Sequence, residues 1–403
     1  MIEWTTKSLG EVTSFMAKGI PPKYTEEENE NTVRVLNQKC NRNFEISYGE
    51  SRIHDLLKKK IPEEKLLHEG DVLINSTGTG TAGRVAQLTN VPVPTTYDGH
   101  MILLRPTAEV TIGYYGYAVK AAQAQIETLA EGSTGQTEIN RKRLQDEVKI
   151  SFPTNKEDQK KIFKVLRQID KKIAVNKHIN KNLLEQALSI YKAWFCDYIV
   201  SDGIRPETWK TTTIDALSSL VTRGIAPKYK DESDQIVLNQ KCIRDHTIDI
   251  SLARRHIPKK INEKWISKGD LLINSTGTGT LGRVAQVWFD ANNMTVDSHI
   301  TIVRPKEPLL QSYIGLWGLS HEKEIEAQHT GSTGQTELPR DRVKSMTLPL
   351  PDNETLRKFN KAIIPMTSII VSNQEENSRL SRLRDSLLPK LMSGEIQVSN
   401  LKL

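Results

Sequence analysis

The segment Leu73-Ile-Asn-Ser-Thr-Gly-Thr-Gly-Thr-Ala-Gly-Arg-Val-Ala-Gln87 returns almost unchanged as Leu272-Ile-Asn-Ser-Thr-Gly-Thr-Gly-Thr-Leu-Gly-Arg-Val-Ala-Gln286. Asn75 and Asn274 are 199 positions apart (274 − 75), which is about half of the 403-residue chain. A period of this length indicates a duplicated domain rather than a solenoid of short repeats. The chain therefore presents one kind of surface twice.

Composition sets the class of protein. The chain is 37% hydrophobic and 26% charged, which predicts a soluble globular protein of two to four structural units. No run of about 18 apolar residues is present, and the first residues lack the order of a signal peptide, so we expect a cytoplasmic protein. The net charge of +7 favours a polyanionic partner. Cys40, Cys196 and Cys242 form no CxxC pair, which indicates neither a disulfide framework nor a zinc site.

Other motifs recur in the same order in each half. Lys18-Gly-Ile-Pro-Pro-Lys-Tyr24 matches Arg223-Gly-Ile-Ala-Pro-Lys-Tyr229, a turn that carries two cations and an aromatic ring. The next match pairs Val35-Leu-Asn-Gln-Lys-Cys40 with Val237-Leu-Asn-Gln-Lys-Cys242, and its alternation of polar and apolar residues predicts a short strand.

The glycine-rich segment invites comparison with a nucleotide-binding P-loop. Gly78 and Gly83 have the required separation, but Arg84-Val85 stands where Lys and Ser/Thr are needed. The residues after Gly83 favour a strand rather than a helix, so we predict a strand, a loop and a second strand. Glycines that expose backbone N–H groups, together with short polar side chains, suit phosphate oxygens or base edges. The alternative is a turn that needs glycine only for its backbone angles.

Two further motifs follow the glycine loop in each copy. Asp98-Gly-His100 matches Asp297-Ser-His299, and without a third ligand we interpret it as structural or as a contact beside DNA. Gly132-Ser-Thr-Gly-Gln-Thr-Glu138 matches Gly331-Ser-Thr-Gly-Gln-Thr-Glu337 and leads into a predicted short helix, where Pro339 replaces Asn140 and suits the first turn. This motif is either an anion site at a helix N-terminus or a plain helix cap.

Each copy closes with a long amphipathic helix. Its seam steps by four and three residues, which is typical of a coiled coil. The seam of the first helix comprises Ile162, Leu166, Ile169, Ile173, Asn176, Asn180, Leu183, Ala187, Ile190 and Trp194. The seam of the second comprises Phe359, Ile363, Met366, Ile370, Asn373, Asn377, Leu380, Arg384, Leu387 and Leu391.

The four seam asparagines predict the direction of pairing. In an antiparallel pair Asn176 meets Asn377 and Asn180 meets Asn373, which would satisfy all four amides and fix the register. A parallel pair, which would join Asn176 to Asn373, stays open. The seam rises about 50 Å, so an antiparallel pair would hold the two domains at opposite ends, roughly 14 to 15 base pairs of B-DNA apart. The first helix carries a basic run that is either a solvated face or a face toward DNA or a partner: Lys160, Lys161, Lys164, Arg167, Lys171, Lys172 and Lys177.

The order of elements, the paired Gly-Ser-Thr-Gly-Gln motifs and the closing Leu387-Leu-Pro-Lys-Leu-Met-Ser-Gly-Glu-Ile396 resemble the specificity subunit of a type I restriction-modification system over essentially the whole chain. The resemblance implies an α+β protein in which two α/β target recognition domains are separated by an antiparallel two-helix coiled coil. The expected domains are residues 1–153, a spacer helix at 154–200, a second domain at 204–352, and a spacer helix with the C-terminal tail at 353–398.

The same resemblance implies a non-catalytic subunit that binds double-stranded DNA. It would join two methylation subunits, which use S-adenosylmethionine to modify adenine N6, and two restriction subunits, which use ATP and Mg. We expect no cofactor, metal or catalytic residue in this chain. The sequence agrees, because it contains no Asn-Pro-Pro-aromatic methyltransferase motif and no Walker A lysine.

Candidate DNA contacts are the polar residues of the shared motifs. In the first copy they are Lys18, Lys23, Asn37, Gln38, Lys39, Asn75, Ser76, Thr77, Thr79, Arg84, Ser133, Thr134 and Gln136. In the second copy they are Arg223, Lys228, Asn239, Gln240, Lys241, Asn274, Ser275, Thr276, Thr278, Arg283, Ser332, Thr333 and Gln335.

Residues common to both copies suit the scaffold or phosphate contacts, so base choice should reside where the copies diverge. These divergent segments are 41–48 against 243–250 and 88–96 against 287–295. Their divergence is modest, which predicts two related half-sites in inverted orientation. Two alternatives stay open: a coiled-coil adaptor without DNA specificity, and an enzyme that binds phosphate through the glycine loops.

Overall fold

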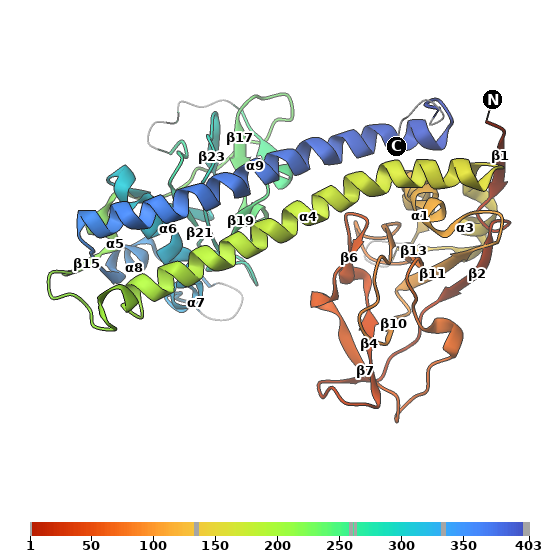
Figure 1. Cartoon of the computed structure of the whole chain (residues 1–403), viewed down its shortest axis with the longest axis horizontal. Coiled ribbons are helices and arrows are strands. Elements are labelled where there is room, and N and C mark those ends of the chain that lie inside the picture. Colours follow the sequence, from red (N-terminus) through yellow and green to blue (C-terminus); the bar gives the residue numbers. More distant parts are fainter. Residues whose placement is uncertain (1, 133–136, 258–260, 262–263, 332–335, 398–403) are drawn as a thin grey trace. The chain divides into compact units, whose positions relative to one another are not determined.

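The computed structural model describes residues 2–132, 137–257, 261, 264–331 and 336–397. The chain forms two compact units (Figure 1): unit 1 comprises Met1–Ile173 and Ser378–Leu403, and unit 2 comprises Ala174–Asn377. Each unit contains a β-rich domain and parts of two long helices, α4 (Lys156–Phe195) and α9 (Asn353–Met392). The unit boundaries fall inside these helices, because each β domain packs on the start of one helix and the end of the other.

A four-stranded antiparallel sheet lies at the centre of unit 1. Its strand order is β2 (Thr13–Lys18), β11 (Met101–Pro106), β8 (Val72–Asn75) and β9 (Val85–Gln87). Successive side chains of a strand point to opposite faces, and both faces are covered here. Val72 and Ile74 join the core beneath α1 (Ile112–Ala121), whereas Leu73 joins a second core.

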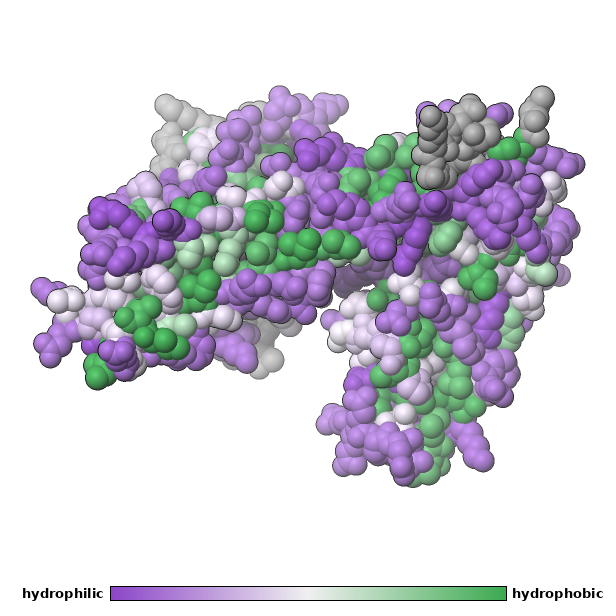
Figure 2. All heavy atoms as spheres, in the orientation of Figure 1, coloured by the Kyte–Doolittle hydropathy of each residue, from purple (hydrophilic) through white to green (hydrophobic). Residues whose placement is uncertain are grey.

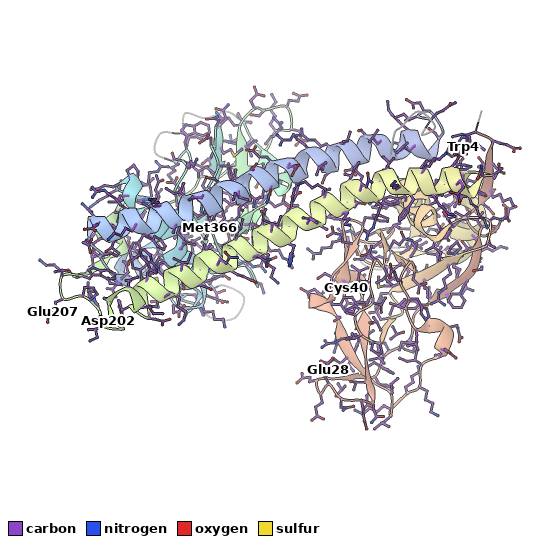
Figure 3. The ribbon with its side chains drawn as sticks, in the orientation of Figure 1. Trp4, Glu28, Cys40, Asp202, Glu207 and Met366 are labelled. Carbon is purple, nitrogen blue, oxygen red and sulfur yellow. The ribbon has the colours of Figure 1, made fainter. Side chains whose placement is uncertain are left out.

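The second core of unit 1 lies between the central sheet and a mixed sheet. The strand order of the mixed sheet is β10 (Thr95–Tyr97), β4 (Thr32–Leu36), β7 (Arg52–Asp55) and β3 (Tyr24–Thr25), with β10 parallel to β4. The strand predicted over Val35–Cys40 is wrong at its end, because β4 stops at Leu36 and a 3-10 helix spans Gln38–Cys40. Cys40 is buried inside this domain (Figure 3).

Shorter pairs of strands complete unit 1, and each pair is antiparallel. They are β1 (Trp4–Ser8) with β14 (Lys149–Pro153), β5 (Asn41–Arg42) with β6 (Glu45–Ile46), and β12 (Ala130–Glu131) with β13 (Glu138–Ile139). The short helices are α2 (Gln123–Thr128) and α3 (Arg141–Glu147).

Unit 2 repeats this plan. Its central sheet has the order β16 (Ser218–Arg223), β24 (Ile300–Pro305), β21 (Leu271–Asn274) and β22 (Val284–Gln286). Its second sheet has the order β20 (Arg254–Arg255), β17 (Ile236–Leu238) and β23 (Met294–Val296). The remaining elements are β15 (Thr211–Thr213), β25 (Thr347–Pro349), β18 (Ile243–Arg244), β19 (Thr247–Ile248), α5 (Ile214–Leu217), α6 (Gln311–Ser320), α7 (Glu322–Glu326) and α8 (Arg340–Ser345).

The predicted short helices after the Gly-Ser-Thr-Gly-Gln motifs are present as α3 and α8. Asn140 caps α3, and its side chain accepts hydrogen bonds from the backbone N–H groups of Lys142 and Arg143. Pro339 occupies the cap position of α8 rather than its first turn, which corrects the prediction. A cap residue has extended backbone angles, and the fixed φ of proline is compatible with them.

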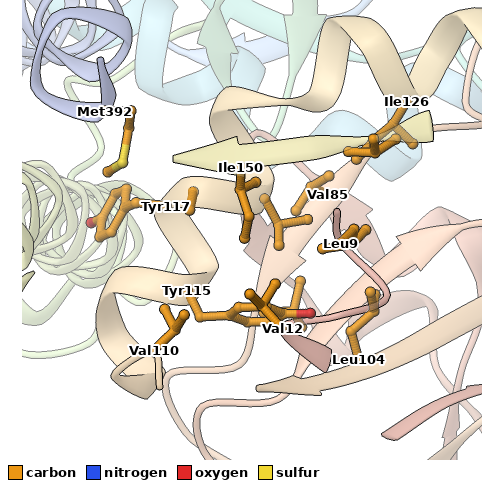
Figure 4. Packing of buried hydrophobic residues seen from close by; sticks show 14 of the residues in the cluster. Leu9, Val12, Val85, Leu104, Val110, Tyr115, Tyr117, Ile126, Ile150 and Met392 are labelled. Atoms are coloured by element: carbon orange, nitrogen blue, oxygen red, sulfur yellow. The ribbon is translucent and has the colours of Figure 1, made fainter. Parts of the chain in front are cut away.

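The long helices pack antiparallel in each unit, which is the first of the two directions that the seam leaves open. In unit 1, Ile162 near the start of α4 shares a core with Leu388, Leu391 and Met392 near the end of α9; Figure 4 shows Met392 beside Tyr117 of α1. In unit 2 the end of α4 shares a core with the start of α9. At the end of α4 the seam is displaced by one residue from the prediction, because Tyr191 and Phe195 are more deeply buried than the predicted Ile190 and Trp194.

The asparagine pairs lie within unit 2 and join as the antiparallel register requires. Asn176 Nδ2 donates to Asn377 Oδ1 at 3.0 Å, and Asn373 Nδ2 donates to Asn180 Oδ1 at 2.8 Å. The prediction that all four amides are satisfied is wrong for one atom, since the buried Oδ1 of Asn176 accepts no hydrogen bond. An unsatisfied buried acceptor costs stability, so this layer gives up stability while it fixes the register.

Candidate nucleic-acid interface

The glycine loop is a hairpin connection in both units. In unit 1 it joins β8 to β9, whose strands pair antiparallel, so the predicted strand, loop and strand are confirmed. Gly78, Gly80 and Gly83 have φ values of +107°, +69° and +88°, in the left-handed region that favours glycine. A Cβ on Gly78 would approach Thr81 Oγ1 to 2.2 Å. The backbone conformation therefore requires these glycines. For the glycines themselves, this favours the alternative that the loop is a turn that needs glycine for its backbone angles.

The loop of each unit is anchored to two other motifs through one threonine. In unit 1 the Thr77 hydroxyl lies 2.8 Å from His100 Nδ1 and 3.3 Å from Gln38 Oε1. In unit 2 the Thr276 hydroxyl lies 2.8 Å from His299 Nδ1 and also bonds to Gln240. Three motifs that are distant in sequence therefore meet at one place in each β domain.

The Asp-x-His motif supports this junction. Asp98 Oδ1 accepts a hydrogen bond from the backbone N–H of His100 at 3.0 Å, and Asp297 accepts one from His299 at 2.9 Å. Burial raises the pKa of both carboxyl groups. Within the part of the chain that the structure describes, no cluster of three or more His, Cys, Asp or Glu side chains could hold a metal ion. The motif acts structurally in this arrangement.

The Gly-Ser-Thr-Gly-Gln motifs end beside the glycine loops. Ile139 N donates to Ser76 O at 2.8 Å, and Leu338 N donates to Ser275 O at 2.8 Å. Glu138 forms an ion pair with Lys18, and Glu337 forms one with Arg223 at 2.7 Å. The candidate contacts Ser133, Thr134, Gln136, Ser332, Thr333 and Gln335 lie outside the described residues.

The described candidate contacts divide by exposure. The buried ones support the loop: Asn75 and Asn274 donate through Nδ2 to the carbonyl groups of Gln38 and Gln240 at 3.0 and 3.1 Å, and their Oδ1 atoms accept no hydrogen bond. Ser76 and Ser275 are also fully buried. The exposed ones are Lys23, Lys39, Thr79, Lys228, Lys241 and Thr278.

Arg84, the half-buried arginine after the first glycine loop, forms a hydrogen bond with the backbone of that loop. Arg84 donates to Gly80 O at 2.9 Å. Arg283, its counterpart, is also half-buried. This side chain of unit 1 therefore braces its own loop in the structure as it stands.

The sequence of this chain is similar to those of known proteins along nearly its whole length. A family model described as the type I restriction modification DNA specificity domain matches residues 1–185. The MjaIX specificity subunit of Methanocaldococcus jannaschii, a type I restriction enzyme, is 23% identical over 99% of this chain and 95% of its own length. The HindI specificity subunit of Haemophilus influenzae is 22% identical over 98% of this chain and 100% of its own length. The chain belongs to the type I restriction-modification specificity subunits.

The fold of this specificity subunit is also similar to a solved structure. The S subunit of the type-I restriction-modification system from M. genitalium matches with a TM-score of 0.55 and 17% identity, over 97% of this chain and 96% of that one. The specificity subunit is the non-catalytic member of its complex. Across the described residues, no helix is both long and apolar enough to span a membrane.

Two features of the specificity subunit escaped the sequence analysis. Arg105 holds the buried Asp71 through two hydrogen bonds of 2.7 and 2.8 Å, and Arg304 holds Asp270 in the same way. These hydrogen bonds raise the pKa of both arginines. The Gly-Asp before each loop strand and the Arg-Pro that ends the partner strand recur in both copies, which is the signal that could have identified the pairs.

The second missed feature is a stacked pair of side chains. The guanidinium of Arg52 lies over the Tyr24 ring at 3.4 Å, and that of Arg254 lies over the Tyr229 ring at 3.4 Å. Arg52 and Arg254 are exposed. The tyrosines belong to the cationic turn motifs, but nothing in those motifs identifies their partners.

Proposed function

We propose that this specificity subunit acts in the cytoplasm and reads a bipartite target in double-stranded DNA, with one β domain for each half-site. The observation that carries the proposal is the recurrence of one loop cluster, built by equivalent residues, in two units of the same chain. The net charge of +7 and the exposed lysines around the clusters supply the attraction to phosphate that such binding requires.

Base choice is proposed to reside in the divergent hairpins. The hairpin of β5 and β6 turns at Asn43 and Phe44, which both have positive φ, and that of β18 and β19 turns at Asp245 and His246 in the same way. The backbone of the turn is therefore shared while its side chains differ. Such a pattern supports two related but distinct half-sites. Their inverted orientation is proposed from the antiparallel register of the long helices.

The partners are proposed from the family. Two methylation subunits would supply S-adenosylmethionine chemistry on adenine N6, and two restriction subunits would supply the ATP- and Mg-dependent steps. Exposed apolar side chains on the long helices support docking there: in unit 2, Val175 and Ile179 of α4 and Ile364 and Ile369 of α9 are 39–53% exposed. Figure 2 shows hydrophobic residues at the surface along part of these helices, alongside other hydrophobic areas on the same face.

The length of α4 and α9, 40 residues each, is proposed to set the number of unread base pairs. One heptad added to both helices, between Ile173 and Asn176 and between Asn377 and Leu380, adds about 10 Å of helix. The unread gap is then expected to grow by about 3 base pairs, with both half-sites unchanged. A gap of unchanged length in the methylated motif contradicts this role.

The experiment that tests the proposal is co-expression with the methylation subunits in a host that lacks adenine methylation, followed by mapping of N6-methyladenine by long-read sequencing. A bipartite motif with two related, inverted half-sites is expected. A folded complex that methylates nothing and binds no DNA at low salt would instead indicate an adaptor. Nucleotide hydrolysis by the purified subunit alone would indicate an enzyme.

A further inference from the structure

Each unit carries an arginine stacked on a tyrosine at an equivalent place. The stacking distance is 3.4 Å from Cζ to the ring centroid in both pairs, Arg52 with Tyr24 and Arg254 with Tyr229. The partners are 28 residues apart in the first copy (52 − 24) and 25 apart in the second (254 − 229). The same geometry is therefore kept although the connecting segment changes length.

Strand pairing brings each pair together. Tyr24 of β3 lies opposite His54 of β7, two residues after Arg52, so ring and guanidinium share one face of the strand pair. In unit 2, Tyr229 forms a bridge with His256, two residues after Arg254. The register of a short antiparallel pair sets both stacks.

The turn before each arginine is held by an asparagine that the sequence analysis assigned to DNA. Asn37 Nδ2 donates to Glu50 O at 2.6 Å, and Asn239 Nδ2 donates to Leu252 O at 3.0 Å. Both carbonyl groups lie two residues before the arginine. The asparagines therefore position the arginines rather than face outward themselves.

Among the described residues, neither Arg52 nor Arg254 forms an ion pair with an acidic side chain. In contrast, Arg34, which lies in the same sheet as Arg52, pairs with Glu28, which Figure 3 labels. Stacking covers the face of a guanidinium and leaves its edge for hydrogen bonds. An exposed guanidinium with a fixed plane has the geometry for bidentate recognition of O6 and N7 of guanine in the major groove. The same fork can also bind a phosphate, and the test below separates the two targets, because only loss of a base contact relaxes a single position of the motif.

We infer that Arg52 and Arg254 each read one guanine of their half-site, with Tyr24 and Tyr229 as positioning residues. The inference rests on the proposed function and adds a property to it. Because the pair recurs while the hairpins diverge, both half-sites share at least one G·C base pair. Exposed Lys23 and Lys228, next to the tyrosines, are suited to the neighbouring phosphates.

The test uses the complete methylation complex and N6-methyladenine mapping for the wild type and for Arg52→Lys and Arg254→Lys, which keep the charge but lose the planar fork. Each variant is expected to relax discrimination at one G·C pair of one half-site by about 5- to 150-fold, while the other half-site stays unchanged. Arg34→Ile is the matched control, because Ile236 occupies that position in the second copy.

The tyrosine is tested separately. Tyr24→Phe retains the ring and is expected to leave the motif unchanged, whereas Tyr24→Leu is expected to relax the same base pair as Arg52→Lys. Thermal unfolding of each purified variant verifies that the domain stays folded. A merely structural stack would lower the unfolding temperature and leave the motif intact.

Three results overturn the inference: a wild-type half-site without any G·C pair, an unchanged motif in both lysine variants, or a uniform loss of methylation with no base relaxed, which identifies a phosphate contact. A failure of the proposed function is distinguishable, since the wild-type complex would then yield no bipartite motif before any variant is compared.

Discussion

The two units share a fold but join their long helices with different chemistry. In unit 1 the junction includes a polar group beside its apolar core: the Tyr117 hydroxyl donates to Asp170, and Arg384 Nη1 donates to Asp170 Oδ1 at 2.8 Å. These three residues come from α1, α4 and α9, and the Arg384 and Asp170 side chains are each 16% exposed. Burial, followed by the Asp170 charge, raises the pKa of Tyr117.

In unit 2 the equivalent positions are Leu316, Thr367 and Ala187, and the junction is aromatic. The Phe195 ring lies 4.8 Å from both Tyr313 and Phe359 between ring centroids. The duplicated backbone therefore tolerates either solution at this place. The glycine loops, by contrast, keep the same residues because their backbone angles allow few others.

The largest expected effect is at the aromatic junction. Phe359 is fully buried, and Phe359→Ala is expected to lower the free energy of unfolding by about 3–5 kcal/mol, because the large cavity removes several ring contacts. Its counterpart in unit 1 is Ile162, and Ile162→Ala, which removes fewer atoms, is expected to cost less. Urea denaturation of the purified subunit measures both. Equal losses would mean that the rings add nothing specific.

A smaller effect is expected at the polar junction. Arg384→Ala leaves the Asp170 carboxylate without its cation and is expected to cost about 2 kcal/mol, reduced from the value for fully buried pairs by the remaining exposure. A double-mutant cycle with Asp170→Asn isolates the pair. Lys192→Ala, which removes an exposed ion pair with Asp197, is the matched control. A loss as small as the control's would show that the pair is solvent-screened.

The smallest change in stability is expected in the asparagine layer. Replacing Asn176 and Asn377 together by leucine removes the unsatisfied Oδ1 and adds apolar contacts, but it also removes the hydrogen bond from Asn176 Nδ2 to Glu376 at 2.6 Å. The two effects oppose each other, so the free energy of unfolding is expected to change by no more than about 1 kcal/mol. Register is expected to loosen at the same time. Light scattering should then detect more of the higher oligomers than in the parent. A less stable variant that stays monodisperse would speak against this role.

Much of the fold is predictable because the motifs recur in both halves of the sequence and because the apolar residues of the long helices follow a regular spacing. The repeated glycine loop predicted its two strands. The seam predicted paired helices in one of two directions, and the antiparallel one, with Asn176 opposite Asn377, is the one present. Prediction failed for two different reasons. Asn37 ends the strand pattern because its side chain caps a 3-10 helix, which is a local effect that the alternation of polar and apolar residues does not reveal. Phe195 replaces Trp194 in the core because Tyr313 and Phe359 lie beside it, which is long-range packing.

The candidate site was predictable as motifs but not as contacts. Thr77, Gln38 and His100 all lay in recognised motifs, yet their meeting depends on the pairing of β8 with β11 and on the packing of the sheet that contains β4 against them. Arg52 was missed because the short Arg-x-His match of Arg52 and His54 with Arg254 and His256 was not recognised, and because Arg52 stacks on Tyr24 only through the pairing of β3 with β7. Asn75 was assigned to DNA by residue type, whereas burial assigns it to the loop.

The central claim is that each β domain reads its own half-site. It is tested most directly by a chain in which residues 209–403 are replaced by a second copy of residues 4–200. Both copies carry Ala187→Arg, because Ala187 is the counterpart of Arg384 and each Asp170 then keeps a cationic partner. Methylation mapping of this complex should give a perfect inverted repeat of the first half-site with the parental gap. Unlike half-sites, or the parental motif, would contradict the account.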